Sequence, residues 1–173
     1  METTKNTLPS YSTQFFNKLS NYLDTKLYYF GSVQRDDYFP KSSDIDVAIF
    51  TENVNSIITK LQNVLNVNKN DFKKFVWRLN SNNTLVNGYK ILYKEPENDF
   101  IAEFSIYDEK HRNDILFEHN DKRDLPFYAT FLLIIIKLLY YTLAIIPSTW
   151  YIQSKKFILT YIIGKNEDHF VII

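Results

Sequence analysis

The sequence has no cysteine, only three glycines and no excess of charge of either sign. Without cysteine the chain can form no disulfide and offers no thiolate metal ligand or cysteine nucleophile, which suits a reducing compartment such as the cytoplasm. Twenty basic and twenty acidic residues give a net charge of zero, so no overall field steers the chain toward nucleic acid. Hydrophobic residues make up 45% of the 173 positions, which is ample for the core of one domain with a small addition.

One of the three glycines lies in the most informative segment. Gly31-Ser32 follows a short aromatic strand, and Asp44-Ile45-Asp46 begins twelve residues after Ser32. Glycine lets backbone amides approach a phosphate closely, and the Ser32 hydroxyl can donate a hydrogen bond to it. Asp44 and Asp46 are two residues apart on a predicted strand, so their carboxylates point to the same side. A divalent cation keeps such neighbouring carboxylates ionised, so we expect a site for a metal-bound triphosphate.

The periodicity along the chain predicts an α/β fold with a mixed sheet flanked by helices. The strand at 44–50 alternates acidic and aliphatic residues, which predicts a strand buried on one face only. Glu103 lies on the less apolar face of a later strand. The expected elements are, in order, a helix at 9–24, a strand at 26–30, a helical turn at 32–38, a strand at 44–50, a helix at 54–65, strands at 71–78, 84–93 and 100–107, a charged helix and linker at 111–124, and apolar helices at 126–146 and 149–163.

Residues 26–107 resemble the nucleotidyltransferase superfamily, which includes DNA polymerase beta and the small minimal nucleotidyltransferases. The shared pattern is a strand, Gly-Ser, a nearby Arg, and Ser-Asp-x-Asp at the start of the next strand. The resemblance implies that the two aspartates bind metal and that a later strand supplies a third carboxylate. The matching residues are Gly31, Ser32, Arg35 and Ser43 for the nucleotide, and Asp44, Asp46 and Glu103 for metal binding and catalysis.

The resemblance implies a transferase that moves a nucleoside monophosphate from a triphosphate such as ATP to a hydroxyl acceptor, with Mg²⁺ or Mn²⁺ as cofactor. The acceptor stays open between a nucleic-acid end, a protein hydroxyl and a small molecule. The alternative is a non-catalytic member of the same fold that binds nucleotide or a partner protein. This sequence departs from the family pattern in the link Asp36-Asp37-Tyr38, which lacks the usual glycine, and in having Glu103 where aspartate is commoner.

Each candidate also has a plainer interpretation. The two aspartates can be solvent-facing residues of an edge strand, and Ser32 can be only a helix cap. Arg35 can be a solvated arginine, and the Asp36-Asp37 link is expected to be a surface turn. Glu103 can be a surface glutamate, with Asp99 and Asp108 as competing third ligands.

The C-terminal part is markedly apolar. Residues 127–146 are long enough to span a bilayer, but Lys137 near their middle opposes insertion by about 2.5–3.5 kcal/mol. We therefore divide the chain into a nucleotidyltransferase-like domain at 9–108, a charged linker or helix at 109–125, and an apolar helical hairpin at 126–164. The hairpin either packs on the core or associates with a membrane. For Lys137 we expect an exposed side chain rather than a phosphate contact.

Overall fold

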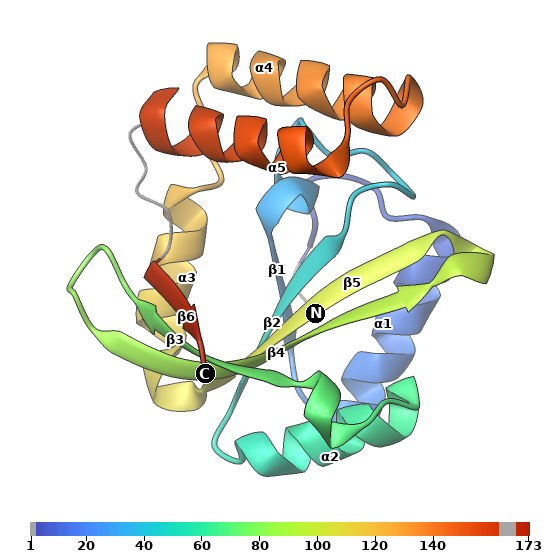
Figure 1. The fold of residues 1–173 in the computed structure, drawn as a ribbon. Coiled ribbons are helices and arrows are strands. Elements are labelled where there is room, and N and C mark those ends of the chain that lie inside the picture. The colour runs from blue at the N-terminus through green and yellow to red at the C-terminus, as the bar shows by residue number, and fades with distance from the viewer. Residues whose placement is uncertain (1–2, 163–168) are drawn as a thin grey trace.

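The computed structural model describes residues 3–162 and 169–173 (Figure 1). Within them, six strands form one mixed sheet in the order β1-β2-β5-β4-β3-β6. Only β2 and β5 run parallel among these pairs, and all other neighbours are antiparallel. The predicted α/β fold class is confirmed. The strands are β1 (Leu27–Phe30), β2 (Ile45–Thr51), β3 (Lys73–Arg78), β4 (Leu85–Glu95), β5 (Phe100–Asp108) and β6 (His169–Ile172).

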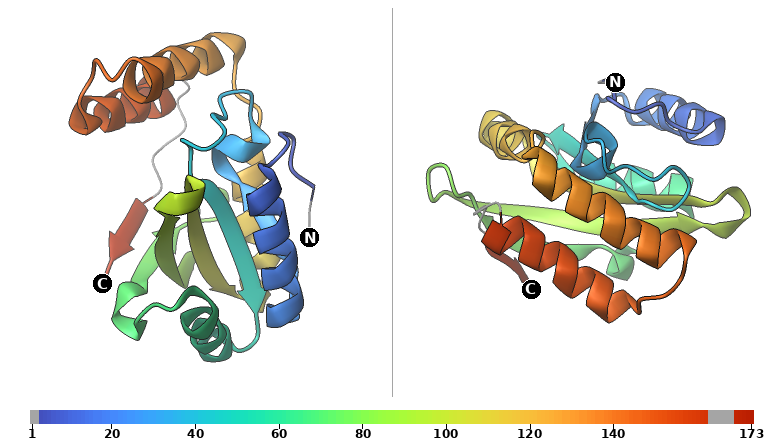
Figure 2. Two further views of the ribbon diagram at one scale, coloured as in Figure 1. Left: turned by 90° about the vertical axis from the view of Figure 1, so that its right-hand side faces the viewer. Right: turned by 90° about the horizontal axis from the view of Figure 1, so that it is seen from above.

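Helices cover both faces of this sheet (Figure 2). On one face, α1 (Ser10–Leu23) and α2 (Val54–Leu65) bury their apolar stripes against the strands in the larger core cluster. On the other face, α3 (Arg112–Asp121) buries Ile115 in a second cluster with Phe50 and Trp77. The predicted bounds of the first two helices are confirmed to within a residue or so, because their apolar spacing and flanking polar residues are local signals.

The second core cluster corrects the prediction for β2. Ile45, Val47 and Ile49 lie in the larger cluster as expected, but Ala48 and Phe50 are buried in the second one. The strand is therefore buried on both faces after its first two residues, because α3 covers the face that we expected to meet solvent. A polar face remains only at the start of β2, where Asp46 is half-buried.

The apolar C-terminal segment forms two helices as predicted, but the first ends before residue 146. Helix α4 (Phe127–Lys137) continues as a π-helical turn to Thr142, the chain reverses at Ala144 with φ 50°, and α5 (Ser148–Phe157) follows. In the described ranges, no helix is long and apolar enough to cross a membrane. Figures 1 and 2 show α4 and α5 side by side across the end of the sheet at which β1 ends and β2 begins. Residues 163 and 164 of the expected hairpin lie outside the described residues.

Strand β6 was not predicted. It pairs antiparallel with β3, with Val171 opposite Val76. The apolar run at the C-terminus is short and has no alternation that identifies it as a strand.

Candidate active site

Gly31 forms the turn that follows β1. The chain enters a short 3₁₀ helix (Gly31–Gln34) with φ +69° at Gly31, a conformation that side chains rarely adopt. A Cβ atom added at Gly31 would lie 1.9 Å from Oδ2 of Asp46. Glycine is therefore needed here both for the backbone conformation and for the close approach of a carboxylate.

We expect Gly31→Ala to lower the free energy of unfolding by about 1–3 kcal/mol, because alanine strains the turn and clashes with the Asp46 carboxylate. Chemical denaturation of the full chain measures this. Adding Asp46→Ala removes the clashing atoms, so the double variant should regain part of the lost stability. Equal stability of wild type and Gly31→Ala would contradict the contact.

The two aspartates and Glu103 lie on neighbouring strands. Asp44 immediately precedes β2, Asp46 is its second residue, and Asp46 is in register with Glu103 of the parallel strand β5. Residues in register on neighbouring strands present their side chains to the same face. Burial and the charge of Asp44 raise the pKa of Asp46, and Glu103 raises it further, whereas Lys155 and Arg35 oppose the shift. Asp44 and Glu103 are thus both near enough to Asp46 for their charges to raise its pKa.

The three carboxylates suit a hard cation that also binds phosphate. Within residues 3–162 and 169–173, no group of three acidic or histidine side chains is already arranged to hold a metal ion alone. Mg²⁺ usually takes one or two carboxylates together with substrate phosphates, so a complete protein cage is not required. The all-oxygen donor set and the mutual repulsion at Asp46 fit Mg²⁺ or Mn²⁺. Lys90 of β4 lies 3.5 Å from Oε2 of Glu103 and partly balances its charge.

The two serines of the motif, Ser32 and Ser43, differ in their hydrogen bonding. The Ser32 side chain is buried, and its hydroxyl has no hydrogen-bond partner among the described residues. A buried hydroxyl without a partner costs stability, so such groups usually serve a ligand or an ordered water. Ser43 differs, because its Oγ already accepts from the Phe39 amide at 3.2 Å and from Nζ of Lys137 at 3.4 Å. The Ser32 hydroxyl therefore has no hydrogen-bond partner among the described residues, while Ser43 holds the loop before Asp44.

The loop between the two motifs contains a buried ion cluster. Asp37 is fully buried and accepts two hydrogen bonds from Arg35, Nε to Oδ1 at 2.7 Å and the second at 3.1 Å. Lys137 of α4, only 2% exposed, lies 2.9 Å from Oδ2 of Asp37 and donates to its carbonyl oxygen at 2.7 Å. Burial opposes ionisation of Asp37, but Arg35 and then Lys137 outweigh it and lower its pKa to about 2.

This cluster corrects two predictions. Lys137 is buried rather than exposed, and of the link only Asp36 is a surface residue, where it pairs with Lys5 at 2.8 Å. Arg35 is not solvated, since its guanidinium lies against Asp37. Helix α4 is therefore anchored to the loop that leads into Asp44.

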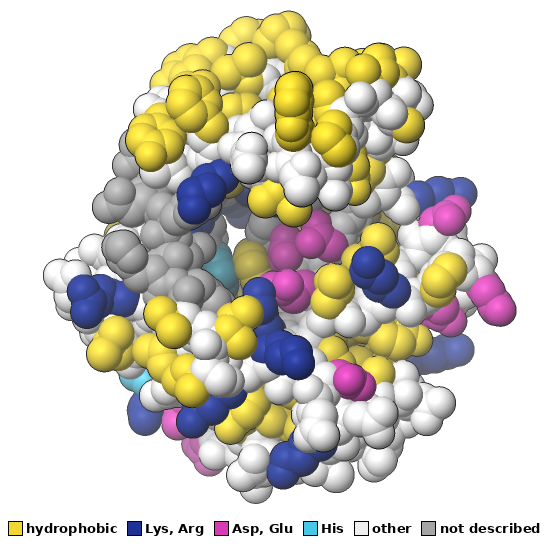
Figure 3. All heavy atoms as spheres, viewed as in Figure 1, with side chains coloured by type: hydrophobic (Ala, Val, Ile, Leu, Met, Phe, Trp, Pro, Cys, Tyr) yellow, Lys and Arg dark blue, Asp and Glu magenta, His cyan; other side chains and the backbone are white. Residues whose placement is uncertain are grey.

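Helix α5 and the π-helical turn that continues α4 bring further residues near the aspartates, of which Tyr151 and Lys155 were not predicted. Burial raises the pKa of Tyr151, and the charges of nearby groups including Asp44 add to the shift. The ring of Tyr151 stacks on Tyr140 with centroids 4.5 Å apart, and its hydroxyl lies 3.5 Å from that of Tyr141. The positive charge of Lys155 lowers the pKa of Asp46 against the larger effect of burial. Figure 3 shows acidic side chains gathered at a hollow beneath the α4 and α5 layer. Only tertiary structure brings these residues together, so no sequence spacing reveals them.

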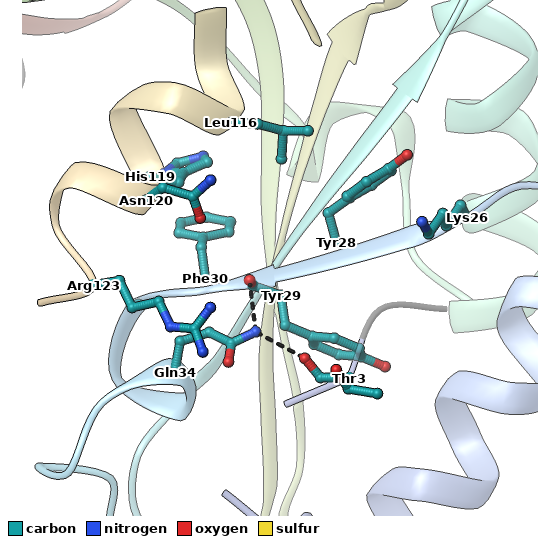
Figure 4. Close-up of a pocket in the computed structure, with 11 residues that line it drawn as sticks. Thr3, Lys26, Tyr28, Tyr29, Phe30, Gln34, Leu116, His119, Asn120 and Arg123 are labelled. Atoms are coloured by element: carbon teal, nitrogen blue, oxygen red, sulfur yellow. Dashed lines mark hydrogen bonds between the residues drawn. The ribbon is translucent and has the colours of Figure 1, made fainter. Parts of the chain in front are cut away.

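A cavity of about 470 Å³ lies along the outer edge of β1 (Figure 4). Phe30 stacks on His119 of α3 there, with ring centroids 3.9 Å apart, and burial lowers the pKa of His119 to about 3. Lys26 and Arg123 also line the cavity, and its described lining contains no carboxylate. Phe30 is the cross-strand partner of Asp46, and Gly31, which also lines the cavity, lies against the Asp46 side chain.

The fold, the Gly-Ser turn and the paired acidic strands agree with a comparison against protein families. The family model of the nucleotidyltransferase domain matches residues 13–173, almost the entire chain. The chain therefore belongs to the nucleotidyltransferase family. A comparison with curated proteins finds no match.

Proposed function

We propose that this chain is a metal-dependent nucleotidyltransferase that moves a nucleoside monophosphate from a nucleoside triphosphate to a hydroxyl acceptor. The observation that carries the proposal is the position of Asp46. Its carboxylate lies directly against Gly31 of the turn, and its strand position is in register with Glu103. The Asp46 carboxylate thus lies between the Gly31-Ser32 turn, which suits a phosphate, and strand β5, which carries Glu103.

The proposed roles follow from these positions. Asp44 and Asp46 hold Mg²⁺ or Mn²⁺, with Glu103 as the third carboxylate. The bound metal would supply Lewis-acid stabilisation of the phosphate charge. The Ser32 hydroxyl donates to a phosphate oxygen of the triphosphate. Arg35 contributes positive charge near Asp46 while Asp37 fixes its guanidinium.

Transfer requires one bond to form and one to break. The acceptor oxygen bonds to the α-phosphorus, and the bond from that phosphorus to the bridging oxygen breaks, so that pyrophosphate leaves with the electron pair. We assign to Glu103 the role of accepting the hydroxyl proton. Glu103 also pairs with Lys90 of β4, whose Nζ lies 3.5 Å from Oε2.

The division of the chain follows from the same positions. We assign the catalytic residues to the domain at 9–108. We propose that α4 and α5, within 126–164, cover the site. Ser43 contributes by holding the loop before Asp44. We also propose a reducing, cytoplasmic setting, which the absence of cysteine supports.

The cavity beside Phe30 is the place that we assign to the acceptor. Gly31 in its lining lies against the Asp46 side chain, and a volume of about 470 Å³ suits a small molecule or the end of a larger one. Lys26 and Arg123 make its described lining basic. Hydroxyl compounds with a carboxylate or phosphate group are therefore the first acceptors to screen.

The experiment is incubation of the full chain with triphosphates labelled on the α-phosphate, with Mg²⁺ or Mn²⁺ and a panel of acceptors. We expect metal-dependent transfer of label with stoichiometric pyrophosphate, and none from the variant with Asp44→Ala and Asp46→Ala. An inactive wild-type chain that still binds triphosphate would instead support the non-catalytic alternative.

A further inference from the structure

The outer side of the α4 and α5 layer is unusually apolar. Figure 3 shows hydrophobic side chains covering the molecule over these two helices. The layer places eleven large apolar side chains in contact with solvent, each between 37% and 85% exposed. They are Phe127, Tyr128, Phe131, Ile135, Leu138, Leu143, Ile145, Trp150, Ile152, Phe157 and Tyr161, and we call them the apolar outer face.

The size of this face exceeds what a monomer usually exposes. Six of its members are aromatic and more than half exposed. At half exposure, six aromatic side chains of about 150–250 Å² each already present about 450–750 Å². The largest apolar patch of a typical monomer is about 300–600 Å², and a standard protein interface buries about 800 Å² on each partner. With its five aliphatic members, the face reaches the area that a stable dimer needs.

The distribution of polar groups indicates the kind of partner. On α4 and the π-helical turn that continues it, the solvent side carries Phe127, Phe131 and Leu138 and no charge, because Lys137 is buried against Asp37. Within this pair of helices the exposed polar residues all lie on α5, and they are Ser148, Thr149, Gln153 and Lys156. An apolar centre with a polar side is the pattern of a protein interface. A helix that lies on a membrane surface instead has a strongly polar face of its own, and α4 has none.

We propose that the apolar outer face is the interface of a symmetric homodimer, in which α4 and α5 of two copies form a four-helix layer. An uncharged α4 surface can face its own copy across a two-fold axis without repulsion between like charges. The second copy buries α4 on all sides, as expected for a helix that is apolar all round. The inference is independent of catalysis, since the carboxylates lie beneath this layer.

Light scattering after size-exclusion chromatography of the full chain, without lipid or detergent, tests the proposal. We expect twice the monomer mass for wild type, and the monomer mass for Phe131→Glu and for Phe131→Lys. Phe117→Glu is the matched control, because Phe117 is 63% exposed but lies on α3. It should remain a dimer. A monomeric wild type, or a dimer that survives both Phe131 variants, would overturn the proposal.

A second readout uses the two tryptophans. Trp150 is 65% exposed in the single chain and Trp77 only 1%, so acrylamide quenching reports on Trp150. We expect weak quenching in the dimer and stronger quenching on dilution of wild type.

The same samples are sedimented with vesicles of phosphatidylcholine alone or with phosphatidylglycerol. A wild type that is monomeric and binds these vesicles would replace the second copy by a lipid surface.

Discussion

Replacing Asp46 by asparagine is expected to abolish transfer without unfolding the protein. The variant loses a metal ligand and its charge, which should lower the rate of nucleotidyl transfer by about 10³-fold or more, since metal catalysis supplies several kcal/mol. The fold should gain stability, because burial and Asp44 already disfavour ionised Asp46. We expect the melting temperature at pH 8 without metal to rise by about 2–4 °C, equivalent to about 1 kcal/mol.

The opposite signs of the two effects make this prediction specific. A residue that only supports the fold would lose activity and stability together. The matched control is Asp36→Asn, since Asp36 is exposed and its pair with Lys5 lies at the surface, so both quantities should stay unchanged. Retained transfer in Asp46→Asn would remove this residue from the site. A large fall in its melting temperature would show instead that the carboxylate stabilises the fold.

Replacing Lys137 by methionine should be the most destabilising of these substitutions. Methionine fills a similar volume but leaves Asp37 buried with only Arg35 as its partner. Removing one member of a buried ion cluster typically costs about 3–5 kcal/mol, because a charge is left without compensation. Urea denaturation measures the loss. Lys18→Met on the solvent side of α1 is the control and should change stability by less than about 0.5 kcal/mol.

A double-mutant cycle separates pairing from packing. If the cost of Lys137→Met comes from the unpaired carboxylate, Asp37→Asn should make the second substitution much less costly. We expect the double variant to lose less stability than the sum of the two single variants, by about 1–3 kcal/mol. Strictly additive losses would mean that the lysine and the aspartate act independently.

The local parts of this structure could be predicted from the sequence. The turn at Gly31-Ser32 was predicted from its glycine, and the strand that begins near Asp44-Ile45-Asp46 was predicted from its two-residue alternation. Both signals lie within a few residues of the sequence. Glu103 was predicted from the resemblance to the nucleotidyltransferase family, which has a third carboxylate on a later strand. The parallel pairing of β2 with β5 brings this residue into register with Asp46.

The predictions that were wrong concern residues whose contacts are distant in sequence. Lys137 and Asp37 are 100 residues apart, and nothing in either neighbourhood indicates that they meet. A lysine within an apolar helix is equally compatible with exposure, so its burial could not be deduced. The second core cluster likewise arises because α3 folds back over β2, which alternation within β2 cannot show.

Equilibrium dialysis of a labelled, non-hydrolysable triphosphate analogue, with and without Mn²⁺, measures whether the turn and the carboxylates bind one ligand together. We propose that the Gly31-Ser32 turn and the carboxylates of Asp44, Asp46 and Glu103 hold a metal-bound triphosphate together. Wild type should retain the analogue only when Mn²⁺ is present, and Asp46→Asn should retain at least about tenfold less. Equal retention with and without Mn²⁺, or equal retention by the two proteins, would contradict the claim.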